Sequence, residues 1–509
     1  MKQMQTGGEP PERAFAEPPF RPCGERRSRR ANELREPCDK EVHMMREQIE
    51  AYFADKEKLL VEAVSRLVAV ESVEGAPAPG APFGPGPAAA LREALAIAGE
   101  WGLTAENHEG YVGTADLNGG EDALHILGHL DVVAPGEGWT VTQPYAPKLV
   151  DGLLYGRGTD DDKGPVAASL LAMKAVKDLG VPLTKNCKVI MGTNEESGSG
   201  DIAWYFARHP YAPATFSPDS GFPVINTEKG SLRPTFTRSW PVQTELPRVK
   251  WLHGGIRLNI LPGDASAGVE GLTMYDIQPV ARNITARTGI KFTFAHEDGL
   301  TVIKAKGEGA HAAYPEGGNN AITGLISLLC ALPLADGACR EALNGLNALM
   351  PHGDCKGRAL GIAQEEPIAG ALTLAFSLLE VTETGLEGRF DSRAPLCATE
   401  DNCLRAAKAA FEEKGFTFEG VQGAPHHVPA DSAFIKTLLR RYEEYTGLKG
   451  ECLSTGGGTY VHDIPGGVAF GCSLPGFDSH LHGADERARV SDLMLSAKLF
   501  AHIIIDLCA

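Results

Sequence analysis

The sequence predicts an α/β domain with a mixed, mostly parallel sheet, interrupted by an inserted α+β domain. The chain has 509 residues, which exceeds what one compact core usually holds, so at least two domains are expected. Short apolar runs alternate with helical periods up to residue 230, which is the pattern of an α/β sheet covered on both faces. Residues 231–428 show a separate pattern of helices and alternating strands, which indicates an insertion.

Residues 1–43 differ from the rest of the chain. They combine several prolines and arginines without any apolar period, so we expect a disordered extension. The alternative is that the natural start is Met44 or Met45 and that the extension is upstream translation.

The region up to residue 230 begins with a helical period at Met45, and a second helix is expected at 88–101 after a Gly/Pro-rich loop at 80–87. Asp151-Gly152 is a typical two-residue hairpin turn. The other elements expected here are strands at 123–133, 148–150, 153–155 and 188–191, and a helix at 165–179 that has proline in its first turn.

The inserted region is expected to contain strands at 291–296, 301–306 and 372–379 and helices at 273–288, 321–332 and 400–414. Two helices, at 432–445 and 491–507, follow it. The expected division is therefore an extension at 1–43, a first domain part at 44–230, an inserted domain at 231–428, and a second domain part at 429–509.

Composition excludes several classes of protein. The net charge of −18 argues against nucleic-acid binding, which requires a basic surface. No apolar run is long enough for a membrane helix, and no signal peptide opens the chain. The 11 cysteines form no C-x-x-C pairs, so we interpret them as reduced thiols of a cytoplasmic protein.

Two motifs suggest metal chemistry in the first part of the chain. His129 and Asp131 lie at the end of an apolar strand, where alternation places them on one face. An imidazole ligand held from behind by a carboxylate fits this spacing. His125 and His129 also have the spacing of a helical zinc pair, but Gly128 and the Leu/Ile/Val run favour a strand. The second motif is the acidic run 160–162, which is costly to crowd unless a cation or solvent relieves the repulsion.

Three further motifs add ligands. Glu195 and Glu196 directly follow a buried strand, Asp219 lies in a Pro-Asp-Ser-Gly turn, and His482 lies beside acids near the C-terminus. Each motif alone is also compatible with a solvated acidic turn or an isolated histidine. Together they make a mixed nitrogen and oxygen ligand set, which suits Zn²⁺, Mn²⁺ or Co²⁺. With two metals bridged by one carboxylate, the water between them becomes a nucleophile near neutral pH.

In order and spacing, these motifs resemble the metal-dependent aminoacylase/carboxypeptidase/dipeptidase family over nearly all of residues 45–509. The matching segments are HLDVVAPGEGW (129–139), GRGTDDDKG (156–164), NEESGSGD (194–201), SPDSGFPVINTEKG (217–230), GAHAAYPEGGNNA (309–321) and STGGGTY (454–460). GRALGIAQEE (357–366) and the long insert resemble the bacterial cytosolic dipeptidase branch, whose members include carnosinase-like, Xaa-His dipeptidases. The family usually has a smaller residue where Asp160 stands.

The resemblance implies an α/β catalytic domain with a dinuclear metal site, most simply two Zn²⁺, and an inserted lid. It also implies a role for each matched residue. The implied metal ligands are His129, Asp161, Asp219, Glu196 and His482, with Asp161 bridging. The implied catalytic residues are Asp131, which orients His129, Glu195, the general base, and His311, which stabilises the oxyanion. The implied substrate-binding residues of the lid are Asn259 and Arg393. In the expected mechanism, the substrate carboxylate is held by Arg393 and by the backbone N–H groups around Gly457, Gly458 and Thr459.

The expected function is hydrolysis of dipeptides or very short peptides, with Glu195 removing a proton from the metal-bridged water. The alternatives are an N-acyl amino acid deacylase or carboxypeptidase of the same family, and an inactive metal- or peptide-binding protein. The simpler relatives dimerise through a shorter lid. Because this insert is about twice as long, as the resemblance implies, we expect His311 to serve its own chain and the protein to act as a monomer, with no nucleic-acid or membrane partner.

Overall fold

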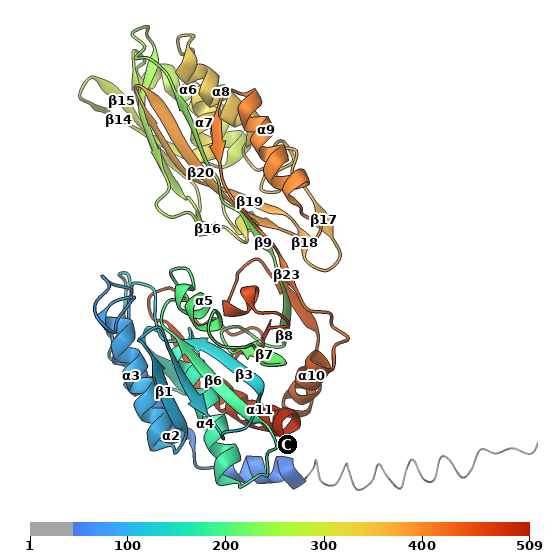
Figure 1. Ribbon diagram of the computed structural model, residues 1–509. Coiled ribbons are helices and arrows are strands. Elements are labelled where there is room, and N and C mark those ends of the chain that lie inside the picture. The colour runs from blue at the N-terminus through green and yellow to red at the C-terminus, as the bar shows by residue number, and fades with distance from the viewer. Residues whose placement is uncertain (1–43) are drawn as a thin grey trace, which may run out of the picture. The chain divides into compact units, whose positions relative to one another are not determined.

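The computed structural model describes residues 44–509 (Figure 1). The extension expected at 1–43 therefore lies outside the described residues. Residues 44–53 form a helix, and the chain from Phe53 to Ala509 forms one compact unit. None of the helices in the described range is long and apolar enough to span a membrane.

The first sheet has nine strands and is mixed, which confirms the expected α/β architecture. Its four central strands, β6, β3, β7 and β25, run parallel, and the pairs β1–β2, β2–β6, β25–β8 and β8–β23 are antiparallel. The strands are β1 (Thr104–His108), β2 (Val112–Asp116), β6 (Asn186–Gly192), β3 (Asp122–His129), β7 (Ala214–Ser217), β25 (Val468–Ala469), β8 (Val224–Glu228), β23 (His426–His427) and β24 (Cys452–Thr455), which pairs with β8.

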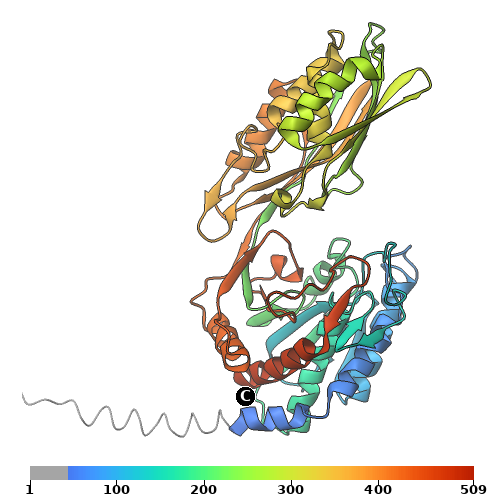
Figure 2. The ribbon, with the colours of Figure 1, turned by 180° about the vertical axis from the view of Figure 1, so that it is seen from behind.

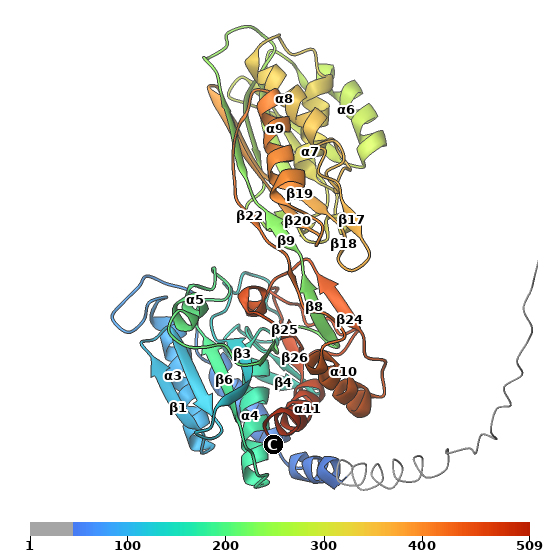
Figure 3. The same cartoon turned by 45° about the vertical axis from the view of Figure 1, so that its right-hand side comes forward.

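Helices cover both faces of this sheet. The helices of this region are α2 (Glu57–Val68), α3 (Pro85–Glu100), α4 (Lys163–Asp178), α5 (Gly200–Phe206), α10 (Ala433–Thr446) and α11 (Val490–Cys508), with a 3-10 turn η3 (Tyr460–Asp463). Leu127 of β3 packs with α5 and η3 on one face, whereas Gly128 lies against Val166 of α4 on the other. Helices α4 and α11 lie side by side (Figure 3). The helix expected at 88–101 begins earlier, at Pro85, because proline at the first helical position suits a helix start.

The second sheet has ten strands, all antiparallel, and belongs to the inserted region. Its strands are β14 (Lys291–Glu297), β15 (Leu300–Lys306), β13 (Asp264–Glu270), β11 (Arg248–Gly254), β19 (Thr373–Thr382), β20 (Gly385–Ala394), β10 (Thr235–Ser239), β21 (Thr417–Glu419), β9 (Gly230–Leu232) and β22 (Gln422–Gly423). This second sheet confirms that the insert has an α+β core of its own. The exact domain limits stay a prediction.

Helices α6 (Met274–Thr288), α7 (Ala321–Ala331), α8 (Ala338–Leu349) and α9 (Ala406–Glu413) form a layer over this sheet (Figure 2). Their apolar faces share one core with the strands. The helix expected at 400–414 begins with a π-helical turn, η2 (Glu400–Arg405). Helix α8 was not expected from the sequence.

Short elements complete the fold. A two-stranded pair, β12 (Ile260–Leu261) and β16 (Ala310–His311), is followed by a 3-10 turn η1 (Pro315–Gly317). A second pair joins β17 (Glu365–Glu366) to β18 (Gly370–Ala371). The hairpin expected around Asp151-Gly152 is present as β4 (Lys148–Val150) and β5 (Leu153–Tyr155), and β26 (Arg487–Arg489) adds a third strand.

Candidate metal centre

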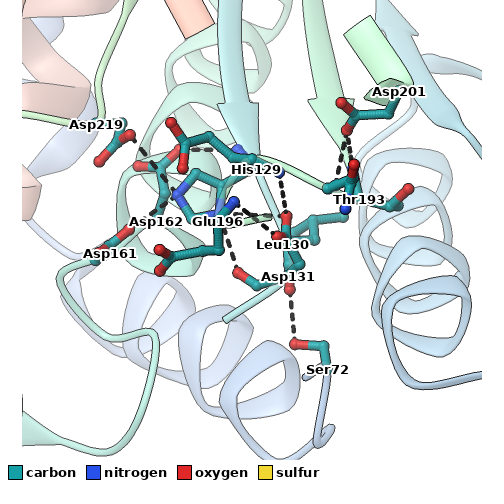
Figure 4. A network of polar contacts seen from close by, with 12 residues as sticks. Ser72, His129, Leu130, Asp131, Asp161, Asp162, Thr193, Glu196, Asp201 and Asp219 are labelled. Carbon is teal, nitrogen blue, oxygen red and sulfur yellow. Dashed lines mark hydrogen bonds and ion pairs between the residues drawn. The ribbon is translucent and has the colours of Figure 1, made fainter. Parts of the chain in front are cut away.

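His129 ends the central strand β3 with its side chain fully buried. Its Nδ1 lies 3.0 Å from the backbone oxygen of Asp131, so Nδ1–H donates to that carbonyl and Nε2 keeps its lone pair. Nε2 points toward carboxylates, 2.8 Å from Asp161 Oδ1 and 3.7 Å from Asp219 Oδ2 (Figure 4). This tautomer and orientation are those of an imidazole metal ligand.

Asp131 holds His129 differently from the sequence expectation. Its carboxylate Oδ1 is 3.6 Å from His129 Nδ1, farther than its own backbone oxygen. The carboxylate instead accepts hydrogen bonds from the N–H groups of Glu195 and Glu196, at 3.0 Å each. Asp131 therefore orients the histidine through its main chain and fixes the di-glutamate loop through its side chain.

The three adjacent acids at 160–162 point in different directions, which relieves their crowding. Asp160 accepts a hydrogen bond from Ser473 Oγ at 2.7 Å, and the buried Asp162 accepts from the His129 N–H at 3.0 Å. Asp161 alone faces the cluster. A methyl group at Gly128 would lie 2.3 Å from Asp162 Oδ2, so the close approach of Asp162 to β3 requires glycine there.

A buried ion pair joins the loops that carry Asp161 and His482. Arg157 binds Glu486, and neither side chain is more than 1% exposed. Glu486 Oε1 also accepts from the N–H of Asp161 at 3.4 Å, while Arg157 Nη2 donates to the backbone oxygen of His482 at 3.0 Å. The pair thus holds two segments that lie over 300 residues apart in the sequence.

His482 lies against the same cluster of carboxylates. Its Nε2 lies 2.7 Å from Asp161 Oδ2 and 3.2 Å from Glu196 Oε1. Burial opposes charging of this imidazole, but the two carboxylates outweigh burial and raise its pKa to about 11. The segment at 478–486 therefore meets the loops after β5 and β6 at one point.

The ligand atoms of five residues from strand ends and turns lie close together. His129, Glu195 and Asp219 form one group within 4.8 Å, and His129, Asp161 and Glu196 form another. Both groups contain His129, and one imidazole nitrogen can bind only one ion. The two groups therefore do not represent two complete metal sites. Glu195, expected only as a base, lies among possible ligands.

The electrostatics of this cluster fit divalent cations. Burial raises the pKa of Glu195 well above its ordinary value, and Asp219 and Glu196 add to the effect against the opposing charge of His129. Burial and then the charge of Asp161 raise the pKa of Asp219 to about 8. His129 Nε2 is buried and has no hydrogen-bond partner among the described residues. Lone pairs of one nitrogen and several carboxylates converge, which is the environment that a divalent cation stabilises.

The loop that carries Glu195 and Glu196 is held by a second carboxylate that sequence reasoning missed. Asp201 Oδ2 accepts from the N–H groups of Thr193 and Asn194 at 2.5 and 2.8 Å (Figure 4). It also accepts from Tyr460 Oη at 2.5 Å. Together with Asp131, it binds four successive N–H groups, from residue 193 to residue 196. Asp201 ends the NEESGSGD segment, but nothing in that pattern shows that its carboxylate turns back on the loop.

His311 and Asn259 lie side by side at the β12–β16 pair, where Asn259 O accepts from the N–H of Ala312 at 2.9 Å. His311 Nδ1 accepts from the N–H of Ala313 at 3.2 Å, so the neutral ring carries its proton on Nε2. Burial and then the charge of Arg393 lower the pKa of His311, which favours this neutral donor. Within residues 44–509 no hydrogen bond or ion pair joins His311 to the acidic cluster.

The expected substrate-binding groups are mostly occupied by protein partners. Arg393 donates to both oxygens of Asp391, at 2.8 and 2.9 Å, and to Gly456 O at 2.6 Å. The Gly457 N–H donates to Thr455 Oγ1 at 3.0 Å. The Thr459 N–H and hydroxyl both donate to the buried Glu228, at 3.2 and 3.0 Å. Of the three expected backbone donors, at Gly457, Gly458 and Thr459, only the N–H of Gly458 has no partner among the described residues.

Comparison with known proteins agrees with these features. The profile of Peptidase family M20/M25/M40 matches residues 125–506. A Bacillus subtilis (strain 168) protein with a provisional dipeptidase name, YtjP, is 34% identical over 457 residues, covering 89% of this chain and 98% of the relative. A Beta-Ala-Xaa dipeptidase from Lactobacillus delbrueckii subsp. lactis is 30% identical over 461 residues, covering 89% and 96%.

Solved structures share the fold. The aminoacylhistidine dipeptidase of Vibrio alginolyticus superposes with a TM-score of 0.54 at 11% identity, covering 88% of this chain and 96% of that one. Human carnosine dipeptidase 1 gives a TM-score of 0.52 at 16% identity, covering 91% and 98%. The family profile spans most of the chain and the sequence relatives span nearly their whole length, so the chain is a peptide-bond hydrolase that belongs to peptidase family M20/M25/M40.

Proposed function

We propose that this protein is a two-metal dipeptidase that hydrolyses dipeptides or very short peptides in the cytoplasm. The observation that carries the proposal is that His129, at the carboxyl end of β3, lies together with His482 and four carboxylates. The full-length similarity to a Beta-Ala-Xaa dipeptidase supports the substrate class. The cysteines of the described residues form no disulfide, which is in keeping with a reducing compartment.

The residues that would hold the ions are those of the cluster. His129, Asp161 and Asp219 would bind one ion, and Asp161, Glu196 and His482 the other, with Zn²⁺ favoured by the mixed nitrogen and oxygen donors. When bound, two such ions supply Lewis-acid polarisation of a carbonyl and a water molecule of lowered pKa. The remaining chemistry belongs to the side chains of this chain.

Glu195 would act as the general base. Its carboxylate lies against the cluster and its N–H is fixed by Asp131. Burial and the neighbouring acids raise its pKa, which brings a glutamate toward the range useful for proton transfer near neutral pH. Glu195 would take a proton from the attacking water and return it to the leaving amine.

His311 would stabilise the oxyanion. Its Nε2–H is the free donor, because Nδ1 accepts from Ala313. A neutral donor aimed at the developing charge contributes about 100-fold or more to turnover. We also propose that His311 serves its own chain and that the protein acts as a monomer, as the long insert implies.

A substrate panel on the metal-reconstituted protein tests this function. Dipeptides, including a β-alanyl one, should be hydrolysed with far higher kcat/KM than tripeptides or N-acetyl amino acids. Preference for N-acetyl amino acids would favour a deacylase, and preference for longer peptides a carboxypeptidase. No turnover with Zn²⁺, Mn²⁺ or Co²⁺, together with unchanged peptide binding, would indicate an inactive binding protein. The Glu195→Gln protein is the matched control for contaminating peptidases.

A further inference from the structure

Arg393, which is expected from the sequence to bind substrate, is not well placed to bind a substrate carboxylate alone. Two of its nitrogens donate to Asp391 and a third donates to Gly456 O. Its guanidinium is buried, with the whole residue 6% exposed, and Asp391 is fully buried. Arg393 therefore resembles a fixed support, with one free hydrogen left on each of its two terminal nitrogens.

A second arginine faces the same carboxylate. In the β9–β20 pair Leu232 lies opposite Ser392 and Ser231 opposite Arg393, so the next residue, Arg233, continues the ladder toward Asp391. Its Nε lies 3.4 Å from Asp391 Oδ2, and its side chain is 45% exposed. Its two terminal nitrogens have no hydrogen-bond or ion-pair partner among residues 44–509.

The three side chains carry a surplus positive charge. Two guanidinium groups share the single carboxylate of Asp391, so the three side chains together carry one net unit of positive charge. Arg393 donates to Gly456 O at 2.6 Å, and a methyl group at Gly456 would lie 2.9 Å from Ala313 Cβ. The N–H of Ala313 in turn donates to His311 Nδ1 at 3.2 Å. Burial and then Arg393 lower the pKa of His311, Asp391 raises it, and His482 and Arg233 lower it further. The surplus therefore lies near the expected oxyanion donor, where one end of a short peptide would bind.

We propose that Arg233 binds the terminal carboxylate of the substrate together with the free edge of Arg393, and thereby makes the enzyme selective for peptides with a free C-terminus. The inference rests on the proposed dipeptidase function. A planar guanidinium with unused N–H groups pairs with a carboxylate through two parallel hydrogen bonds. The half-exposed Arg233 can move to meet it, whereas Arg393 is held by Asp391 and Gly456.

The test compares a dipeptide with the same dipeptide carrying a C-terminal amide. Arg233→Ala should lower kcat/KM for the dipeptide by about 10- to 100-fold, the loss expected for a hydrogen-bonded ion pair. The loss should appear mainly in KM, because the carboxylate is held equally in ground and transition states. Hydrolysis of the amide should change by less than about 2-fold, the size expected when no partner is lost.

Two variants serve as controls. Arg233→Lys keeps the charge without the planar fork and should recover part of the activity on the dipeptide. Arg282→Ala, on the exposed side of α6, should change neither substrate. Equal loss on dipeptide and amide, or no loss on either, would overturn the proposal.

A binding measurement separates this proposal from the proposed function. Zn²⁺-loaded Glu195→Gln protein, with and without Arg233→Ala, is titrated by calorimetry with the dipeptide and its amide. The Kd of the dipeptide should rise by about 10- to 100-fold on loss of Arg233, while that of the amide stays the same. If native protein turns over neither peptide but this binding difference is present, the proposed reaction fails and the carboxylate site stands. If binding is unaffected, the carboxylate site fails.

Discussion

Asp201→Asn should impair catalysis without removing a metal ligand or the base. Asp201 Oδ2 accepts three hydrogen bonds, from Thr193, Asn194 and Tyr460, and Oδ1 accepts a fourth from the Ile202 N–H at 2.7 Å. A carboxamide has one oxygen, so either orientation of the side chain sets its NH₂ group against at least one buried donor. The loop that carries the general base would then lose part of its support.

The size of the effect follows from these contacts. A hydrogen bond to a charged acceptor contributes about 1.5–3 kcal/mol, and a buried donor left without a partner costs about 1–3 kcal/mol. We therefore expect the free energy of unfolding to fall by about 2–3 kcal/mol. Displacement of the Glu195 carboxylate by about 1 Å would lower kcat by roughly 100-fold. Tyr460→Phe removes one hydrogen bond to this carboxylate and leaves no buried donor without a partner, so it should cost about 1.5 kcal/mol, the lower end of that range.

The assay is kcat and KM on a dipeptide, well below the melting temperature, with zinc content measured on the same samples. Asp122→Asn is the matched control, since Asp122 binds Asn186 and Lys188 at the other end of β3. The control should lose stability but keep kcat. Asp201→Asn should keep its zinc and lose kcat. If its kcat stays within about 3-fold of native, well short of the loss expected from misplacing the base, Asp201 does not position the base.

Three further changes have defined outcomes. Glu195→Gln should keep metal content near native and cut kcat severely, since only the base is lost; near-normal turnover would refute that role. His311→Ala should lower kcat by about 100-fold, and mixing it with Glu195→Gln protein should restore nothing unless sites are shared between chains. The hydrogen bond that His462 Nδ1 donates to the Glu228 carboxylate raises the pKa of His462. This pair therefore stabilises the fold fully below the unfolded-state pKa of about 6.5 and less as pH rises through the folded-state pKa. The Tm advantage of native protein over His462→Gln should therefore be largest near pH 6 and shrink toward about pH 9; a constant difference would contradict it.

Much of the fold was predictable because local patterns and tertiary packing agree. The apolar run ending at His129 is β3, and the Asp151-Gly152 turn joins β4 to β5. The start of α3 at Pro85 and the helix α8 were missed. The proline that starts α3 stands in the Gly/Pro-rich run 80–87, which was expected from the sequence to be a loop. Helix α8 begins after Gly337, which offers no capping side chain.

The site was predictable as a set of residue types but not as a set of contacts. Sequence motifs can place Asp131 and Asp201 near the centre, yet only coordinates show that both carboxylates bind the N–H groups of one loop. The sequence likewise does not show that Arg393 forms an ion pair with Asp391, because that pairing depends on the three-dimensional arrangement of the two side chains. The position of Arg233 beside Asp391 follows only from the register of β9 against β20.

The claim that the acidic cluster is a two-metal peptidase centre is tested most directly by stoichiometric reconstitution. Metal-free protein is titrated with Zn²⁺ while dipeptide hydrolysis and bound zinc are measured together. We predict that activity saturates at two ions per chain, and that Asp161→Ala, which removes the proposed bridge, abolishes it. Full hydrolysis by metal-free protein, or saturation at two ions in the Asp161→Ala protein, would contradict the account.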